Sequence, residues 1–346
     1  MIATAVSLVA GCGALSDEGD DKKTVRLVTH DSFAVSDHVL KEFKKRTGYT
    51  VKLVTGGDAG SATNQAVLTK DNPQGDVFFG ADNTLVSRAL EADVFASYQA
   101  KGLDHIPERF RLDAAKHRVT PVDYGEICVN YDREYFRKKK LDPPETLDDL
   151  VKPRYRDLLV TQNAATSSPG LGFLLATVAE YGESGWRSYW KKLKANGVEV
   201  VDGWEQAYND RFSGARASKG KGDKPLVVSY ASSPPVEVLD VKPEPEQAPT
   251  GVSKGTCFEQ VEFAGLLNGA DNPEGGKKLL DFLVDRTFQE DLPLQMFVNP
   301  VRKDAKLPKL FTKYGEKVED SATMPPKRIT ERRDGWIKAW TALVVR

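Results

Sequence analysis

The sequence predicts an α/β protein built from two lobes. At roughly 150 residues per domain, a chain of 346 residues favours about two domains. Strand-like and helix-like runs alternate at the spacing of βαβ units, which is typical of a parallel sheet covered by helices on both faces. The alternation occurs twice, over residues 24–90 and again after about residue 120. We therefore expect two such sheets, joined where the chain crosses between lobes.

The composition supports a core-bearing chain and excludes several classes of protein. Hydrophobic residues make up 40% of the sequence and charged residues 29%. The 49 basic and 50 acidic residues leave a net charge of −1, which excludes disorder driven by charge and removes the basic footprint of a nucleic-acid binder. No apolar run reaches the ~18 residues that would indicate a membrane span.

The first block of the chain contains three strand–helix units. Its strands are rich in β-branched and aromatic residues, and a helix-prone stretch follows each one. The expected strands are residues 24–29, 50–55 and 76–80. The expected helices are residues 37–46, 61–68 and 83–90.

The second block repeats the pattern, and the last third returns to strand and helix. The expected strands are residues 126–131, 157–161, 198–202, 226–230 and 258–265. The expected helices are residues 170–181, 184–195, 204–213 and 274–284, followed by a terminal helix. Residues 242–249 are proline-rich and predict an exposed loop. Trp336 and Trp340 are four residues apart in the terminal helix, so they share one face and are expected to dock that helix.

The amino terminus resembles a bacterial lipoprotein signal. Residues 2–10 are short and apolar, and the stretch Leu8-Val9-Ala10-Gly11-Cys12 follows directly. In such signals the peptide before the cysteine is removed and the cysteine is lipidated, so residues 1–23 are expected to be a signal and tether, with Cys12 as the lipidation site. No Lys or Arg precedes Lys22, which departs from the usual basic start of such a signal.

Export would place the two remaining cysteines in an oxidising compartment. Cys128 and Cys257 each lie in a strand-like run, and together they enclose about 130 residues. A disulfide between them is expected, and two separate buried thiols are the alternative. Because these strands are the natural crossings between lobes, a bridge would lie at the hinge.

Candidate binding residues cluster directly after strand runs. Open α/β sheets bind ligands at the carboxyl ends of their strands, and two such sheets can direct their strand ends into one cleft. The candidates found in this way are His30, Asp31, Asp58, Asp82, Asn83, Trp204 and residues 230–233. Trp204 and Tyr230 could hold a flat or cationic ligand by stacking and cation–π contact, and Asp31 or Asp58 could balance its positive charge.

A helix start offers a second kind of contact. Ser167 and Ser168 precede Pro169 at the beginning of an apolar helix, where unpaired backbone N–H groups suit a hydroxyl, a carboxylate or a phosphate. The sequence contains no His/Cys group with zinc spacing, no Walker-type loop and no GxSxG motif. We therefore expect no metal, no cofactor and no assembled catalytic set.

Taken together, the motifs resemble those of the thiamine-binding periplasmic components of ABC transporters. The matching segments are VTHDSFA (28–34), GGDAGSATNQ (56–65), DVFFGADNTLV (76–86), VDYG (122–125), VNYD (129–132), TSSPGLGF (166–173), GWEQAY (203–208), VSYASSP (228–234), FLVDRTFQEDLP (282–293) and NPV (299–301). They occur in order from about residue 24 to the end. His30, Ala59 and Phe297 stand where the family more often has an aromatic residue, a glycine and a tryptophan.

The resemblance implies a two-lobed periplasmic-binding-protein fold of type II, with hinge strands and a ligand cleft between the lobes. The first lobe would comprise residues 24–122 and 258–346, and the second residues 123–257. The resemblance places ligand-binding motifs on Asp58, Ala59, Ser167, Ser168, Trp204, Tyr230, Ala231, Ser232 and Ser233. The serine hydroxyls would hold the hydroxyethyl or phosphate end of thiamine or a thiamine phosphate.

The resemblance also implies partners and a location. The expected partners are the membrane permease and the ATPase of an ABC importer. The protein is expected to be an exported monomer, either periplasmic or lipid-anchored on the outer side of the cytoplasmic membrane.

Two other functions remain open at this stage. A ferric-iron binder of the same class typically shows two adjacent tyrosines, and the chain has no Tyr-Tyr pair. A thiamine-degrading enzyme of this fold would use a cysteine nucleophile with an acidic base, for which Cys128 and Glu126 are the candidates. That nucleophile requires a free thiol, which a bond to Cys257 would remove.

Overall fold

The computed structural model describes residues 23–346. The expected lipidation site Cys12 and the leader around it lie outside the described residues. No helix in the described part of the chain is long and apolar enough to cross a membrane.

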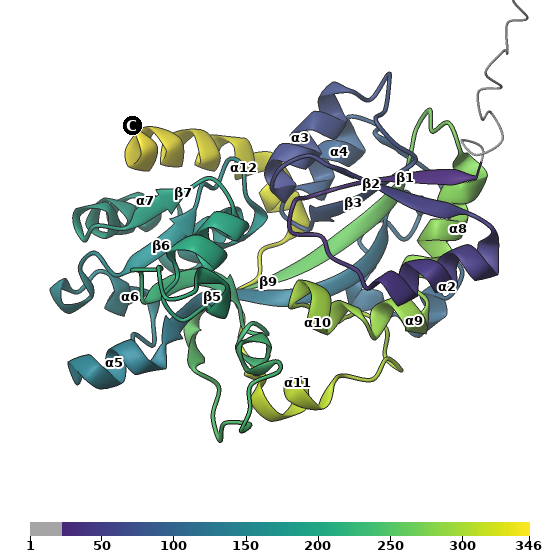
Figure 1. The fold of residues 1–346 in the computed structure, drawn as a ribbon. Helices are drawn as coiled ribbons and strands as arrows, with labels where there is room; N and C mark the ends of the chain where they lie inside the picture. Colours follow the sequence, from purple (N-terminus) through teal and green to yellow (C-terminus); the bar gives the residue numbers. More distant parts are fainter. Residues whose placement is uncertain (1–22) are drawn as a thin grey trace, which may run out of the picture.

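The described chain is a mixed α/β structure with two lobes (Figure 1). Its strands are β1 (Thr24–Thr29), β2 (Thr50–Thr55), β3 (Val77–Asp82), β4 (Phe95–Ala96), β5 (Thr120–Asp132), β6 (Leu159–Gln162), β7 (Glu199–Val201), β8 (Leu226–Tyr230), β9 (Thr250–Leu267) and β10 (Asn299–Pro300). Its helices are α2 (Asp37–Thr47), α3 (Ala59–Leu68), α4 (Val86–Glu91), α5 (Arg133–Lys139), α6 (Leu147–Leu150), α7 (Ser168–Ala195), α8 (Pro273–Leu283), α9 (Arg286–Gln289), α10 (Leu292–Met296), α11 (Lys309–Tyr314) and α12 (Pro326–Trp340).

Hydrogen bonding joins the strands into one sheet with the order β2-β1-β3-β9-β5-β8-β6-β7. The three strands at each end, β2-β1-β3 and β8-β6-β7, are parallel within their group. The two central strands, β9 and β5, are antiparallel to each other and to their outer neighbours. The expectation of two separate parallel sheets is therefore wrong, because the crossing strands pair with both groups and make the sheet continuous.

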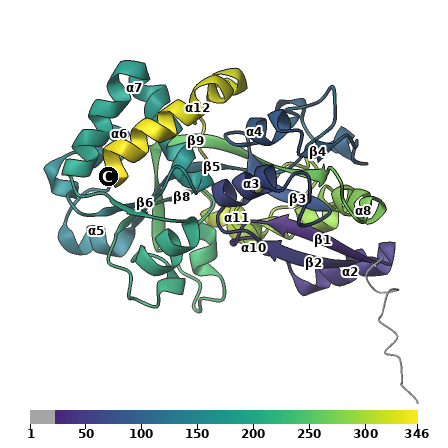
Figure 2. The ribbon, with the colours of Figure 1, turned by 90° about the horizontal axis from the view of Figure 1, so that it is seen from above.

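The long strands β5 and β9 run from one lobe into the other (Figures 1 and 2). Their pairing shifts between Ile127, which lies opposite Phe258, and Val129, which lies opposite Ser253. Residues 254–257 are the extra residues of this irregularity. The Val129 N–H donates to Thr256 Oγ1 at 2.8 Å, and the Thr256 hydroxyl donates to the Ser253 carbonyl at 2.7 Å, so the irregular segment keeps hydrogen-bond partners.

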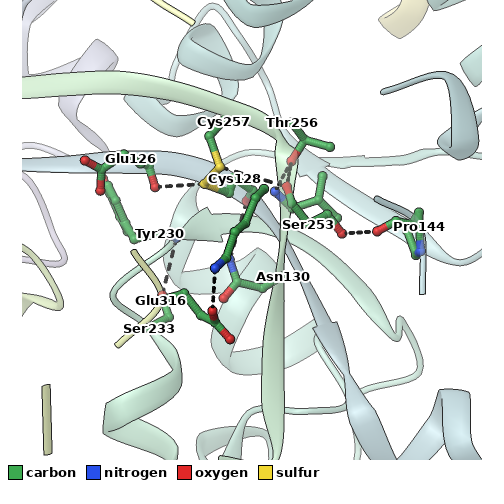
Figure 3. Close-up of a disulfide and its surroundings, with 12 residues drawn as sticks. Glu126, Cys128, Asn130, Pro144, Tyr230, Ser233, Ser253, Thr256, Cys257 and Glu316 are labelled. Atoms are coloured by element: carbon green, nitrogen blue, oxygen red, sulfur yellow. Dashed lines mark hydrogen bonds and ion pairs between the residues drawn. A yellow bond between two sulfur atoms is a disulfide. The ribbon is translucent and has the colours of Figure 1, made fainter. Parts of the chain in front are cut away.

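A disulfide joins β5 to β9 at this point (Figure 3). Cys128 and Cys257 are bonded across 129 residues of sequence, with 4.2 Å between their Cα atoms. Both side chains are buried. The expected pairing therefore forms in the structure, at the crossing between lobes.

The chain changes lobe within the two long central strands in the division that we propose. We propose that the first lobe comprises residues 24–122 and 258–346 and the second residues 123–257, with both changes of lobe inside β5 and β9. Helix α12 contacts α7 of the second lobe as well as α4 of the first.

The tryptophan pair docks the terminal helix as expected. Trp336 and Trp340 are fully buried, and the Trp340 ring packs edge-on against Trp190 of α7, with 5.4 Å between centroids. Helix α7 itself contains the two helices expected over 170–181 and 184–195. They are separated at Gly182, whose φ of 65° is open to glycine but costly for other residues.

Candidate ligand-binding site between the lobes

A cavity of about 140 Å³ opens between the lobes. One side is lined by residues that follow β1 and β2, by Glu262 within β9, and by residues in and after α10. The other side is lined by residues from α7 and β8 and by residues in and just before η4 (Gln206–Arg211). The lining residues are His30, Ser32, Ala34, Asp58, Ala59, Glu262, Gln295, Met296, Phe297 and Val298 from the first side, and Ser168, Pro169, Trp204, Glu205, Asn209 and Tyr230 from the second.

The structure brings together six of the residues that the sequence singled out. His30, Asp58, Ala59, Ser168, Trp204 and Tyr230 all line the cavity. The others lie near it without lining it. Asp31 is exposed, and Ser167, Ala231, Ser232 and Ser233 are buried behind the lining. Their roles in ligand binding stay predictions.

Asp58 connects the two lobes through its carboxylate. It is the N-cap of α3, where Oδ1 accepts the Ala59 N–H at 2.6 Å. The same oxygen accepts the Ser168 N–H from α7 at 3.3 Å, and Oδ2 accepts the Trp204 N–H at 2.8 Å. One buried side chain therefore caps its own helix and binds two backbone donors of the opposite lobe. Burial raises the pKa of Asp58, and the Trp204 N–H opposes that shift because it stabilises the carboxylate.

The Trp204 ring is held in place by three contacts. It stacks on Tyr208, with 5.0 Å between centroids and 13° between planes, and it meets Phe297 edge-on at 5.7 Å. Its Nε1–H donates to Ser229 Oγ at 2.9 Å. A ring fixed in this way is a preorganised wall for a flat ligand, because little side-chain entropy is lost on binding.

A second polar link between the lobes runs through Ser168. Its hydroxyl donates to Asp82 at the end of β3 and receives an N–H from Gln260 of β9 at 2.6 Å. Gln260 Nε2 also donates to Asp82 at 3.0 Å. Because all three side chains are buried, their hydrogen bonds are needed to offset the loss of water.

Buried acids lie at the wall of the cavity and behind it. Burial raises the pKa of Glu262 to about 8, and His30 Nε2 lies 3.5 Å from its Oε1. Burial, together with the neighbouring Glu262 carboxyl, raises the pKa of Asp123 well above its ordinary range. Burial lowers the pKa of His30, so the imidazole is neutral at pH 7.

Stability is expected to fall as the pH rises from about 5 to about 8. In the unfolded chain Glu262 loses its proton near the ordinary value of 4.5, but in the folded protein it does so only near 8. Between these values the folded state holds a proton that the unfolded state has released, so raising the pH favours unfolding. Thermal midpoints measured across this window check the sign. Glu262→Gln should make the fall shallower, and a wild-type midpoint that climbs with pH would contradict the expectation.

Close backbone approach brings the two lobes together beside Asp58. The Ser61 N–H donates to the Thr166 carbonyl of the opposite lobe at 3.0 Å. A β-carbon on Gly60 would lie 2.6 Å from the same carbonyl oxygen. Glycine is therefore required at position 60 for this approach, for lack of space.

Several lining residues escaped the sequence analysis. Glu262, Gln295, Met296 and Val298 reach the cavity from the last third of the chain, where the sequence had marked only Phe297. Glu205 and Asn209 follow Trp204 on the same helical segment. Because Trp204 was expected at a strand-to-helix junction facing the cleft, the first turns of that helix could also have been predicted to line the cavity. Phe297 lies in the left-handed region with φ 61°, and such backbone strain in a non-glycine residue often marks functional sites.

The groups that a cysteine-dependent enzyme or a metal site would need were also sought in the structure's described residues. Cys128 is bonded to Cys257 and buried, so it offers no free thiol for nucleophilic attack. Within residues 23–346, no group of three or more His, Cys, Asp or Glu side chains is arranged to hold a metal ion.

Comparisons with known proteins agree with the fold. Residues 72–242 match the family described as bacterial extracellular solute-binding protein. The thiamine-binding periplasmic protein of Salmonella typhimurium is 31% identical over 330 residues, which cover 94% of this chain and 94% of that protein. A solved structure of a periplasmic thiamin binding protein superposes with a TM-score of 0.78 at 28% identity and covers 93% of this chain and 96% of its own.

A ferric binding protein from Campylobacter jejuni shares the fold alone. It has a TM-score of 0.70 at 16% identity and covers 92% of this chain and 99% of its own. The identity to the Salmonella protein, by contrast, extends over nearly the whole of both chains. These findings confirm the two-lobed fold and the family resemblance: the chain belongs to the family of the thiamine-binding periplasmic proteins.

Proposed function

We propose that this protein binds thiamine outside the cytoplasm and delivers it to an ABC-type importer, as a binding protein and not as an enzyme. The observation that carries the proposal is the composition of the cavity between the lobes. Trp204, Tyr230 and Phe297 supply aromatic walls, while Asp58, Glu205 and Glu262 supply carboxyl groups. The names of the relatives point to the same ligand.

Thiamine suits this cavity in shape and in charge. Its two aromatic rings are flat, and its thiazolium ring carries a fixed positive charge. Stacking and cation–π contact with an indole or phenol ring contribute roughly 0.5–2 kcal/mol each. A carboxylate in a site shielded from water stabilises the cation further, because Coulomb interactions are stronger at low dielectric. We assign the stacking contacts to Trp204 and Tyr230 and the charge balance to Asp58.

The proposal extends to the protein's setting. Its partners are the permease and ATPase of the importer, and the protein acts as a monomer. A lipid on Cys12 anchors it to the outer side of the cytoplasmic membrane. Mass spectrometry of the mature protein tests the anchor, since retention of residues 1–11 with an unmodified Cys12 would remove it.

Calorimetric titration of the purified protein tests the function. Submicromolar binding of thiamine is expected, and ferric citrate and spermidine serve as competing ligands of other classes. No heat with thiamine, together with clear binding of either competitor, would end the assignment. Loss of thiamine during incubation of the reduced protein with aniline would instead indicate the degrading enzyme.

Gly60→Ala is expected to weaken thiamine binding about fivefold. The added methyl group collides with the Thr166 carbonyl, and overpacking of about 1 kcal/mol opposes the close approach of the lobes. The matched control is Gly335→Ala in α12, where a β-carbon meets nothing within 4 Å. Calorimetry on both variants checks the expectation, and equal affinities in the two would refute it.

A further inference from the structure

Three buried acids lie in a row across the middle of the sheet. Asp82 of β3 and Asp123 of β5 are each directly opposite Glu262 of β9 in the strand pairing. Residues directly opposite each other in a sheet point to the same face, with about 4.5–5.5 Å between their Cβ atoms. All three residues are at most 3% exposed. Glu262, the middle acid, also lines the cavity, so a bound ligand meets this row at Glu262.

The outer two acids of the row differ in their hydrogen bonds. Asp82 Oδ1 accepts the Thr84 N–H at 2.9 Å, and Oδ2 accepts an N–H from Gln260 Nε2 at 3.0 Å. Burial raises the pKa of Asp82, and these donors oppose that shift because they stabilise the carboxylate. Neither side-chain oxygen of Asp123 has a hydrogen-bond partner among the described residues, and burial raises its pKa well above the ordinary range. Asp82 is therefore the member that best carries a negative charge, and Asp123 the member that best holds a proton.

Glu262 keeps its proton at pH 7 in the ligand-free protein. Burial raises its pKa to about 8, and the charges of Asp82 and Asp58 act in the same direction, against the Asp123 carboxyl beside it. His30 Nε2 lies 3.5 Å from Glu262 Oε1 and has no hydrogen-bond partner among the described residues. Burial lowers the pKa of His30, so the imidazole supplies no positive charge at pH 7.

Apart from His30, the other titratable groups that line the cavity are acids and a phenol. They are Asp58, Glu205 and Tyr230, and burial raises the pKa of all three. No described residue that lines the cavity is Lys or Arg. A cation that enters the cavity therefore meets Glu262 without competition from a basic side chain of the lining.

We propose that Glu262 releases its proton when thiamine binds, an inference that rests on the proposed function. A fixed positive charge beside a carboxyl group at low dielectric favours the carboxylate. The O–H bond of Glu262 breaks, its electron pair stays on the carboxylate, and the proton passes to water and buffer. The new carboxylate then joins Asp58 in balancing the thiazolium charge.

This proton release makes the affinity for thiamine depend on pH. Thiamine binds best to the form of the protein that has lost the proton, and the fraction of that form grows as the pH rises toward 8. The dissociation constant is therefore expected to fall about fivefold from pH 6 to pH 8. Reciprocally, about half a proton is expected to leave the protein for each thiamine bound at pH 7.5.

Isothermal titration calorimetry of the wild-type protein with thiamine tests the release. Titrations at pH 7.5 are made in PIPES, which has a small ionisation enthalpy, and in Tris, which has a large one. The buffer takes up the released proton, so the measured heat should differ between the two buffers in proportion to the number of protons released. Binding with no buffer dependence, or with proton uptake, would overturn the inference and leave the proposed function intact. Failure of thiamine to bind at any pH would overturn both.

Glu262→Gln identifies the group that releases the proton. Glutamine has nearly the same shape but no titratable proton. The variant is therefore expected to bind thiamine with affinities at pH 6 and pH 8 that agree within roughly twofold, and with equal heat in the two buffers. Release of the wild-type amount of proton by this variant would assign the proton to another acid and overturn the inference.

The matched control is Glu259→Gln on the same strand. Glu259 is partly exposed, pairs with Arg109 at 2.9 Å and does not line the cavity, so the wild-type proton release is expected. Loss of the release in this control as well would show that any lost acid on β9 abolishes it, which would overturn the assignment to Glu262. Circular dichroism checks the fold of both variants, and the buffer comparison on the wild-type protein depends on neither.

Discussion

Trp204→Ala is expected to weaken thiamine binding at least about tenfold. The indole is a rigid wall of the cavity because Tyr208, Phe297 and Ser229 fix it from three directions. Buried aromatic anchors of this kind commonly contribute about 2 kcal/mol or more to binding, and alanine removes the stacking surface altogether. Isothermal titration calorimetry of the folded variant measures the loss.

Trp204→Phe is the matched control for the ring itself. Phenylalanine keeps an aromatic face but cannot donate to Ser229 Oγ, so a smaller loss is expected, of about 1 kcal/mol. Circular dichroism and the thermal midpoint establish that both variants fold. If the alanine variant folds and binds thiamine as tightly as the wild type, Trp204 is not the anchor.

Removing the Cys128–Cys257 disulfide is expected to lower the free energy of unfolding by about 4–5 kcal/mol. The bond closes a loop of 129 residues, and the chain-entropy model assigns a cross-link of that span this stabilisation. The variant to measure is Cys128→Ala/Cys257→Ala, because alanine leaves no buried hydroxyl in the two sites. Urea unfolding followed by circular dichroism gives the free energy.

Reductant provides the matched comparison. The wild-type protein in dithiothreitol should unfold at nearly the same urea concentration as the double variant, whereas dithiothreitol should leave the double variant unchanged. A difference below about 1 kcal/mol between oxidised wild type and double variant would show that the loop is already constrained without the bond.

Much of the fold could be predicted because its signals are local. Residues 24–29 and 50–55 form strands over the expected range, since β-branched residues bounded by polar turns specify a strand without reference to the rest of the chain. β9 shows the limit. The strand begins at Thr250, whereas the sequence predicted a start at residue 258. Lys254 and Gly255 interrupt the apolar pattern where the strand is irregular, and this interruption concealed its first half. The pairing of β5 with both groups of strands depends on contacts distant in sequence, which periodicity does not encode.

Some residues of the candidate site could likewise be predicted from local sequence, and others could not. Asp58, Trp204 and Tyr230 follow strand ends, so the rule for open α/β sheets places them at one cleft. Glu262 lies within β9 among neighbours that are all buried, so no local pattern in the sequence marks it as a lining residue. The link from Asp58 to the backbone of Ser168 and Trp204 could not be predicted, because it exists only once two lobes from distant parts of the chain meet.

The position of the disulfide also determines how the molecule responds to a protease. Residues 128–257 form a covalently closed ring, and β6, β7 and β8 all lie inside it. A single cut in the exposed loop near residue 245 would open that ring without releasing either fragment. A nicked molecule outside the cytoplasm would therefore remain one covalent unit until the bond itself is reduced.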